Sequence, residues 1–401
     1  MSLQVDIAMR SEHDNLPWRK KNLPKIVNGY LFGDTIGEGS YGKVKEVLEV
    51  STLVRRAVKI IKAVRLRKIP NGRANVEQEL RILRRVHHRN VISLRDVFRD
   101  CHRKKLYMVM EYAACSLQQM LDGSDEKKLP VFQAHFFFTQ LIEGLSYLHS
   151  QGVIHKDIKP GNLLVSLDGT LKISDFGVAE LLSHFAKDDW CRIAQGTPKF
   201  QPPEIVSGIV EEYRGRKVDI WACGVTLYNL VSGEYPFEGD VIMRLFDNIA
   251  NQPLKMPQTV TISSDLEALL TRLLEKDPDK RIDICGIRNS IWFKNTFVPV
   301  CSFSLYILIF CIFLFFSFIQ FVFKRTHRPL SVYAALEQMF CGAMEDSSSL
   351  NGEEVTADIP QSDTSASRAR RLAASDGSFS NVCNAPGSSS GLTETRRNRS
   401  M

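Results

Sequence analysis

The sequence lacks the features that identify several common classes of protein. Its nine cysteines are scattered and none forms a Cys-x-x-Cys pair, so we expect neither a zinc finger nor a dithiol redox centre. Thiols without a regular spacing are typical of a reduced, cytosolic protein rather than of a disulfide framework. Residues 1–18 contain no apolar core followed by small residues, and we therefore expect no secretory signal.

Acidic residues are too few to balance the basic ones. The chain carries 52 Lys and Arg against 45 Asp and Glu, a formal net charge of +7. Part of the excess lies in two basic runs, Trp18–Lys25 and Arg65–Arg73. No zinc-finger pair or aromatic RNA-binding signature accompanies them, so we expect no nucleic-acid partner. We interpret both runs as solvated charge, with a localisation signal or an acidic partner as the alternative.

Composition divides the chain into five successive regions. Residues 1–29 are polar and basic, and we expect them to be loosely ordered. Residues 30–293 alternate periodic apolar segments with turn signals, as globular domains do. Residues 297–323 contain no Asp, Glu, Lys or Arg. An amphipathic flanking segment, 329–344, precedes a tail, 345–401, whose polar composition predicts disorder.

The globular region changes character along its length. Tyr30–Val50 and Val54–Val64 alternate apolar and polar residues with glycines between them, which predicts strands. Asn75–His88 has helical spacing. The pattern farther on is again helical, in Phe132–Gln151 and Val218–Gly233. We therefore expect a small β-rich lobe followed by a larger helical one.

The first motif with chemical content is "GEGSYGKV", which places Gly37, Gly39 and Gly42 in a G-x-G-x-x-G-x-V pattern. Glycines let backbone amides approach phosphate oxygens that a Cβ would exclude. Dinucleotide-binding folds share this spacing, but there a helix follows the glycines. Here a β-rich segment follows, and Lys59 lies on the next predicted strand.

Two later motifs, "VIHKDIKPGNLL" and "ISDFGVAE", supply the remaining groups that phosphoryl transfer requires. Asp157 can accept a hydrogen bond from an incoming hydroxyl, and Lys159 can neutralise charge on a transferred phosphoryl group. Asn162 and Asp175 are oxygen ligands suited to Mg²⁺ that bridges ATP phosphates. Positioning and charge neutralisation are what this reaction needs most.

In this order the motifs resemble those of the eukaryotic protein kinases over residues 30–293. The resemblance implies an α+β, two-lobed protein-kinase fold, with a small β-rich lobe that includes helix C and a larger helical lobe. It implies ATP and Mg²⁺ as cofactors, with Mn²⁺ as a substitute. Lys159 and the Thr197 of "GTP" are typical of the serine/threonine class, so the implied reaction transfers the ATP γ-phosphoryl group to protein Ser or Thr.

The resemblance also assigns roles to individual residues. It implies that Asp157, Lys159 and Thr197 are catalytic and that Asn162 and Asp175 bind the metal. Glu79 is implied to be the helix-C partner of Lys59. The implied ATP-binding residues are Ile36, Gly37, Glu38, Gly39, Ser40, Tyr41, Gly42, Lys43, Val44, Ala57, Lys59, Glu79, Glu111, Ala113 and Leu164.

Further positions match structural features of that family. Glu204 of "PPE" matches the end of the activation segment and is expected to form a buried ion pair with Arg281. Asp219 is expected to hold the catalytic loop, which carries Asp157. The regulatory spine would run through Leu83, Leu94, His155 and Phe176.

One position departs from the general family pattern. The chain has His155-Lys156-Asp157 where most members have His-Arg-Asp. The arginine normally clamps a phosphate on the activation segment through its planar fork, whereas lysine offers a point charge. We therefore expect weak dependence on activation-loop phosphorylation, and an active state held in another way, such as by a bound protein.

The particular residues of several motifs narrow the resemblance to one type of kinase. "IPNG-ANV" before helix C and the lysine of His-Lys-Asp are similar to the liver-kinase-B type, which acts upstream of AMP-activated kinase. This implies a complex with a STE-related adaptor pseudokinase and an armadillo-like scaffold of the MO type. It also implies activation-loop threonines of AMP-activated kinase and its relatives as substrates. The implied location is the cytoplasm, with the nucleus as an alternative.

Two other functions stay open at this point. One is an enzyme of the calmodulin-dependent kinase-kinase type. The other is a pseudokinase that activates another enzyme by binding it, although the intact Lys59, Asp157, Asn162 and Asp175 argue against this alternative.

The apolar run 297–323 has two interpretations. It is long enough to cross a bilayer, which would make the chain a single-pass membrane protein with its catalytic region in the cytosol. However, it contains nine Phe and no Gly or Ala, and membrane helices tend to use small residues. A pyrimidine-rich intron read in frame would encode such a mixture. The second interpretation is therefore a translated retained intron, at about Val298 to Gln320.

Overall fold

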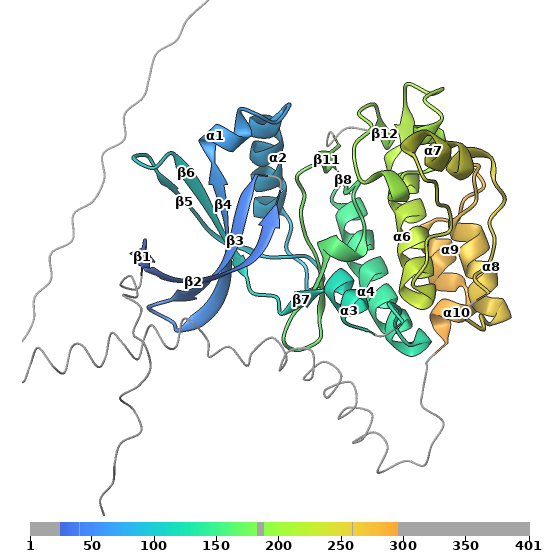
Figure 1. Ribbon diagram of the computed structural model, residues 1–401, viewed down its shortest axis with the longest axis horizontal. Helices are drawn as coiled ribbons and strands as arrows, with labels where there is room; N and C mark the ends of the chain where they lie inside the picture. The colour runs from blue at the N-terminus through green and yellow to red at the C-terminus, as the bar shows by residue number, and fades with distance from the viewer. Residues whose placement is uncertain (1–24, 40, 125, 183–187, 259, 296–401) are drawn as a thin grey trace, which may run out of the picture. The chain divides into compact units, whose positions relative to one another are not determined.

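The computed structural model describes a two-lobed α+β domain (Figure 1). The residues it describes are 25–39, 41–124, 126–182, 188–258 and 260–295. The predicted loosely ordered segment therefore lies mostly outside the described residues. The apolar run 297–323, the flanking segment 329–344 and the tail 345–401 lie outside them entirely.

The smaller lobe is built on one antiparallel sheet whose strands lie in the order β1-β2-β3-β4-β6-β5. Its residues alternate between the two faces, as strand geometry requires. Val58 and Val109 are buried in a small cluster on one face, while Ile61 and Met108 join the main core on the other. The strands are β1 (Lys25–Val27), β2 (Tyr30–Gly39), β3 (Gly42–Glu49), β4 (Val54–Lys62), β5 (Leu94–Asp100) and β6 (Lys105–Glu111).

Helix α2 (Gly72–Arg85) packs on this sheet and follows the short helix α1 (Ala63–Leu66). It begins at Gly72, earlier than the predicted start. Val76 and Leu80 form its buried stripe and belong to the same apolar cluster as Ile61. Glu79 lies on this buried stripe as well, where a carboxylate is tolerated only with a partner.

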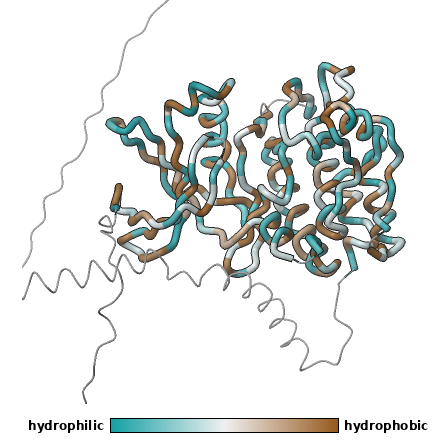
Figure 2. The backbone as a smooth tube through the Cα atoms, in the orientation of Figure 1, coloured by the Kyte–Doolittle hydropathy of each residue, from teal (hydrophilic) through white to brown (hydrophobic). Residues whose placement is uncertain are grey.

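The larger lobe is mainly helical. Helix α6 is buried along almost its whole length, and α4 and α8 pack against it. Figure 2 shows hydrophobic and hydrophilic stretches alternating along these elements. The helices are α3 (Leu117–Gly123), α4 (Val131–Ser150), α5 (Pro203–Val206), α6 (Gly215–Ser232), α7 (Ile242–Asn251), α8 (Ser264–Leu273), α9 (Ile284–Asn289) and α10 (Ile291–Lys294).

Short strands hold the loops that carry the predicted catalytic and metal-binding residues. β7, β9 and β10 form one small sheet, β8 pairs with β11, and β12 pairs with β13. The loop after β8 carries Asp157, and Asp175 is the second residue after the end of β10. These strands are β7 (Cys115–Ser116), β8 (Val153–Ile154), β9 (Leu163–Val165), β10 (Leu171–Ile173), β11 (Glu180–Leu181), β12 (Trp190–Cys191) and β13 (Tyr213–Arg214), with 3-10 turns at Pro160–Asn162 and Pro198–Phe200.

The two-lobed fold predicted from the sequence is confirmed, but the expectation of a single-pass membrane protein is corrected. Across the described ranges, none of the helices is both long enough and apolar enough to cross a bilayer. The two longest, α4 and α6, bury their apolar residues inside the larger lobe. The run 297–323, on which the membrane expectation was based, lies outside the described residues.

Candidate active site

The glycine motif lies at the turn between β2 and β3, where Gly39 pairs with Gly42. A Cβ on Gly42 would lie 1.7 Å from the carbonyl oxygen of Ile60 on β4, so this glycine is required by packing. Gly39 is different, because a Cβ there would meet no described atom within 4 Å. Packing therefore does not require a glycine at position 39. The open space beside its backbone is consistent with the approach of phosphate oxygens, which a Cβ would hinder. Ser40 lies outside the described residues.

The other predicted residues of this hairpin differ in their exposure to solvent. Glu38 and Lys43 face one another across the strands as an exposed ion pair, with Nζ 2.8 Å from Oε1. The hydrogen bond from Lys43 lowers the pKa of Glu38. Ile36 and Val44 are half-buried. Tyr41 is buried, and its ring lies beside Lys59.

Lys59 on β4 stands at the centre of a charged triad. Its Nζ donates to Glu79 Oε1 at 2.6 Å and Oε2 at 3.0 Å, and to Asp175 Oδ1 at 3.2 Å. Burial opposes the charge on Lys59, but the Glu79 and Asp175 carboxylates outweigh it and raise its pKa above the ordinary value. Lys59 is therefore a fixed cation, held by α2 and by the segment after β10.

Asp157 carries the carboxylate of the loop between β8 and β9, and both of its oxygens have partners. Its Oδ1 accepts from the backbone N of Thr197 at 2.9 Å and from Thr197 Oγ1 at 2.7 Å. Its Oδ2 accepts from Asn162 Nδ2 at 2.8 Å and lies 2.7 Å from Lys159 Nζ. Burial acts to raise the pKa of Asp157, but the bonds from Lys159 and Thr197 lower it below the ordinary value. At neutral pH it is thus an ionised hydrogen-bond acceptor.

Asn162 and Asp175 are placed together as oxygen ligands. The backbone oxygen of Asn162 accepts from Ser174, the residue before Asp175, at 2.9 Å. Asn162 Nδ2 donates to Asp157, which leaves the amide oxygen available to a cation. The Asp175 side chain is 50% exposed, and the charge of Lys59 lowers its pKa.

This donor set fits Mg²⁺ bound jointly with ATP phosphates. Within the described ranges no group of three or more His, Cys, Asp or Glu residues could hold a metal ion. Mg²⁺ typically takes one or two protein oxygens and completes its shell with phosphates and water. One amide oxygen and one ionised carboxylate match that requirement.

The remaining predicted ATP-binding residues lie at or near the connection between the lobes. Ala57 is buried on β4, and Leu164 is half-buried on β9. Ala113 follows the end of β6 in irregular backbone. The Glu111 side chain accepts a hydrogen bond from the backbone N of Ser93 at 2.8 Å and forms an ion pair with Lys172. It therefore stabilises the connection between the lobes.

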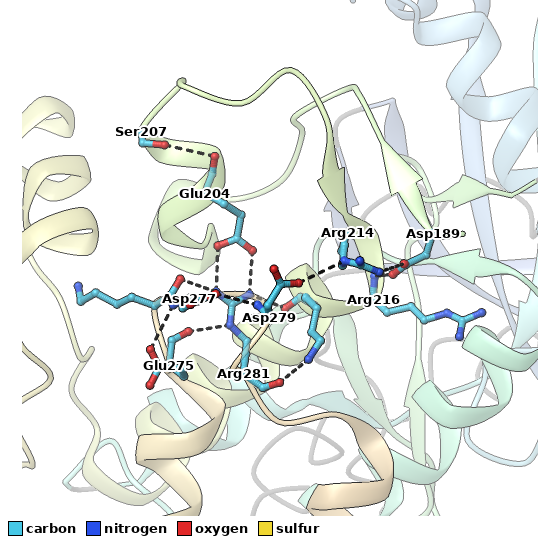
Figure 3. Close-up of polar contacts among 11 residues, drawn as sticks. Asp189, Glu204, Ser207, Arg214, Arg216, Glu275, Asp277, Asp279 and Arg281 are labelled. Carbon is cyan, nitrogen blue, oxygen red and sulfur yellow. Dashed lines mark hydrogen bonds and ion pairs between the residues drawn. The ribbon is translucent and has the colours of Figure 1, made fainter. Parts of the chain in front are cut away.

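The end of the activation segment is anchored to the larger lobe (Figure 3). The Arg281 side chain is 0% exposed and donates to both Glu204 carboxylate oxygens, at 2.8 and 2.9 Å. Asp219 on α6 accepts from the backbone N of His155 at 2.9 Å and of Lys156 at 2.7 Å. These are the contacts expected from the sequence.

The predicted spine residues lie within or against one apolar core. Leu83 and Phe176 are buried in it and Leu94 packs against it. The His155 and Phe176 rings lie with centroids 5.1 Å apart.

Lys156 has partners that the sequence analysis did not identify. Its Nζ forms an ion pair with Glu180 and donates to the Ile193 backbone oxygen at 3.2 Å. It also lies 5.8 Å from the centre of the Tyr213 ring. Glu180 thus gives Lys156 the negative partner that a phosphate on the activation segment would give to the arginine of a His-Arg-Asp motif. The only sequence signal was an acidic residue shortly after "DFG".

The comparisons with known proteins agree with this geometry. A family profile described as protein kinase domain matches residues 30–293. The chain is 55% identical over 290 residues to the serine/threonine-protein kinase STK11 of Gallus gallus, covering 71% of this chain and 65% of that protein. It is 56% identical over 283 residues to STK11 of Homo sapiens, covering 71% and 64%.

A more distant relative is also similar. The serine/threonine-protein kinase par-4 of Caenorhabditis elegans is 49% identical over 302 residues, which cover 73% of this chain and 49% of that protein. The resemblance to the liver-kinase-B type is thus confirmed at the level of sequence similarity. The chain spans less than two thirds of the length of the vertebrate relatives that it matches.

Proposed function

Because the chain belongs to the protein kinase family, we propose that it transfers the γ-phosphoryl group of ATP to serine or threonine residues of other proteins. The observation that carries this proposal is the Asp157 carboxylate, which is ionised and held by Lys159, Asn162 and Thr197 at 2.7–2.9 Å. A threonine bonded to both the catalytic aspartate and the lysine is the arrangement implied for the serine/threonine class.

In the proposed mechanism each group has one task. Asp157 accepts the hydrogen bond of the substrate hydroxyl and orients it for attack. Lys159 offsets negative charge on the transferred group. Lys59, held by Glu79, fixes the ATP phosphates. Mg²⁺ supplies further neutralisation of the phosphates when bound.

The substrates and partners follow from similarity rather than from the site alone. The similarity to relatives named STK11 supports the resemblance to the liver-kinase-B type. On that resemblance we propose activation-loop threonines of AMP-activated kinase and its relatives as substrates, and activation by a STE-related adaptor pseudokinase with an MO-type scaffold rather than by calmodulin. The Lys156–Glu180 pair supports an activation segment that needs no phosphate.

The test is phosphate transfer by the full chain, alone and with adaptor and scaffold, to a peptide containing an activation-loop threonine. The wild type is expected to transfer phosphate in the complex, and the same peptide with alanine at the threonine is expected to take none. Asp175→Ala should abolish transfer, because it removes a metal ligand, while Asp122→Ala on the exposed end of α3 should leave it unchanged. An inactive wild-type complex would overturn the proposal.

A further inference from the structure

The motif "IPNGRANV" is one of the two features on which the resemblance to the liver-kinase-B type depends, yet none of its residues has a role in the site described above. In the structure it forms the start of α2. Asn71 adopts a left-handed backbone with φ of 54°, and a Cβ on Gly72 would lie 2.7 Å from the backbone oxygen of Leu66. These two residues therefore let the chain turn sharply into the helix. Asn75 follows in the first turn, where its backbone N donates to the Asn71 oxygen at 2.9 Å.

Asn75 reaches the glycine hairpin. Its Nδ2 donates to the hydroxyl oxygen of Tyr41 at 3.1 Å. Residues four apart lie on one face of a helix, so Asn75 and Glu79 project from the same side of α2 at successive turns. Glu79 forms an ion pair with Lys59 on β4, while Asn75 is hydrogen-bonded to Tyr41, the residue that precedes β3.

Tyr41 lies directly beside the charged groups of the site. It is 7% exposed, and its ring centre is 5.8 Å from Lys59 Nζ. A Cβ on Gly177, in the Asp-Phe-Gly segment, would lie 3.4 Å from both Tyr41 Cε2 and Asp175 Oδ1. The tyrosine thus lies next to the segment that carries the predicted metal ligand, while its hydroxyl is held by α2.

We propose that Asn75 is a positioning residue, which ties the glycine hairpin to α2 through Tyr41 and thereby sets the hairpin over the ATP phosphates. This inference rests on the proposed function and deepens it. Besides the apolar packing of Val76 and Leu80, α2 is held to the sheet at one point by the Lys59–Glu79 pair and can pivot about it. A second attachment one turn away, about 6 Å along the axis, restrains the pivot and couples the hairpin to the helix.

The two side chains of this contact can be removed separately. Tyr41→Phe deletes the hydroxyl and keeps the ring, and Asn75→Ala deletes the donor. Each is expected to raise the KM for MgATP about fivefold, the effect of one ordinary hydrogen bond, with the KM for the peptide unchanged. The double variant should be no worse than either single one, because both remove the same bond.

Tyr30→Phe is the matched control. Tyr30 is 8% exposed in the same lobe, and its hydroxyl contacts Asp96 at 3.4 Å, away from the phosphate site. It should leave the KM for MgATP unchanged. Additive effects of the Tyr41 and Asn75 variants, or an equal rise in the Tyr30 variant, would overturn the proposal.

Nucleotide binding separates this proposal from the proposed function. The Kd of a fluorescent ATP analogue with Mg²⁺ is measured for the same full-length variants, with no acceptor present. A roughly fivefold weaker Kd in the Tyr41 and Asn75 variants supports the tether even where the wild type transfers no phosphate. An unchanged Kd in both variants contradicts the tether even where transfer is normal.

Discussion

Replacing Glu180 with glutamine removes the carboxylate that neutralises Lys156 while keeping nearly the same shape. The Lys156 side chain is 2% exposed and that of Glu180 is 34% exposed. Breaking a fully buried pair costs about 3–5 kcal/mol. Glu180 is partly solvated, and Lys156 keeps the Ile193 oxygen and the Tyr213 ring, so we expect a loss of about 2 kcal/mol in the free energy of unfolding, close to that of a hydrogen bond to a charged group.

Thermal unfolding and limited proteolysis of the full chain measure this effect. A loss of about 2 kcal/mol corresponds to a fall in Tm of about 4–8 °C for a domain of this size. Because Lys156 also binds the backbone at Ile193, we expect faster cleavage within the activation segment and a lower kcat.

The control is Glu212→Gln. Glu212, which lies beyond the activation segment, forms an exposed ion pair with Arg192 inside it, and exposed ion pairs contribute little. It should leave Tm and kcat nearly unchanged. If the Glu180 and Glu212 variants behave alike, the Lys156–Glu180 pair does not hold the activation segment and the reasoning is refuted.

Two further predictions concern the glycine hairpin and the catalytic carboxylate. In Gly42→Ala the new Cβ would collide with the neighbouring strand, so the free energy of unfolding in urea should fall by about 3 kcal/mol or more. Gly39→Ala should fold normally and raise the KM for ATP severalfold. A stability loss at Gly39 and a KM effect at Gly42 would contradict the assigned roles. Because the folded-state pKa of Asp157 is lowered from 3.8, its ionised form stabilises the protein fully above that pH, and this contribution disappears as the pH falls through the lowered pKa. The unfolding free energy of wild type minus Asp157→Asn should thus be constant from about pH 7 to pH 5 and shrink below about pH 4; a difference already lost between pH 7 and 5 would show that the carboxylate is not held by its partners.

Much of the fold and the site could be predicted from residue order. Alternating apolar residues indicated the strands of the smaller lobe, and the spacing of Asp157, Asn162 and Asp175 indicated where the phosphate-transfer groups lie. Such predictions succeed because periodicity and motif spacing are local properties of the chain. The start of α2 was predicted too late, because Gly72 and the left-handed Asn71 act through backbone conformation rather than apolar spacing.

The contacts of Lys156 and Asn75 could not be predicted in this way. Lys156 binds Glu180, and Asn75 binds Tyr41, across 24 and 34 positions of the chain. Neither partner belongs to the motif of the residue that it contacts. Only the pairing of β8 with β11, and the packing of α2 against the sheet, brings each pair within hydrogen-bond distance.

The amino-acid sequence by itself determined the class of chemistry, since glycines, a lysine, an aspartate, an asparagine and a second aspartate in that order are sufficient to indicate phosphoryl transfer. The tertiary structure alone decided how the charges are balanced. The pKa of Asp157 depends on Thr197, which lies 40 residues away and supplies two hydrogen bonds. Burial and long-range hydrogen bonding depend on packing, and packing is a property of the whole folded chain rather than of any one motif.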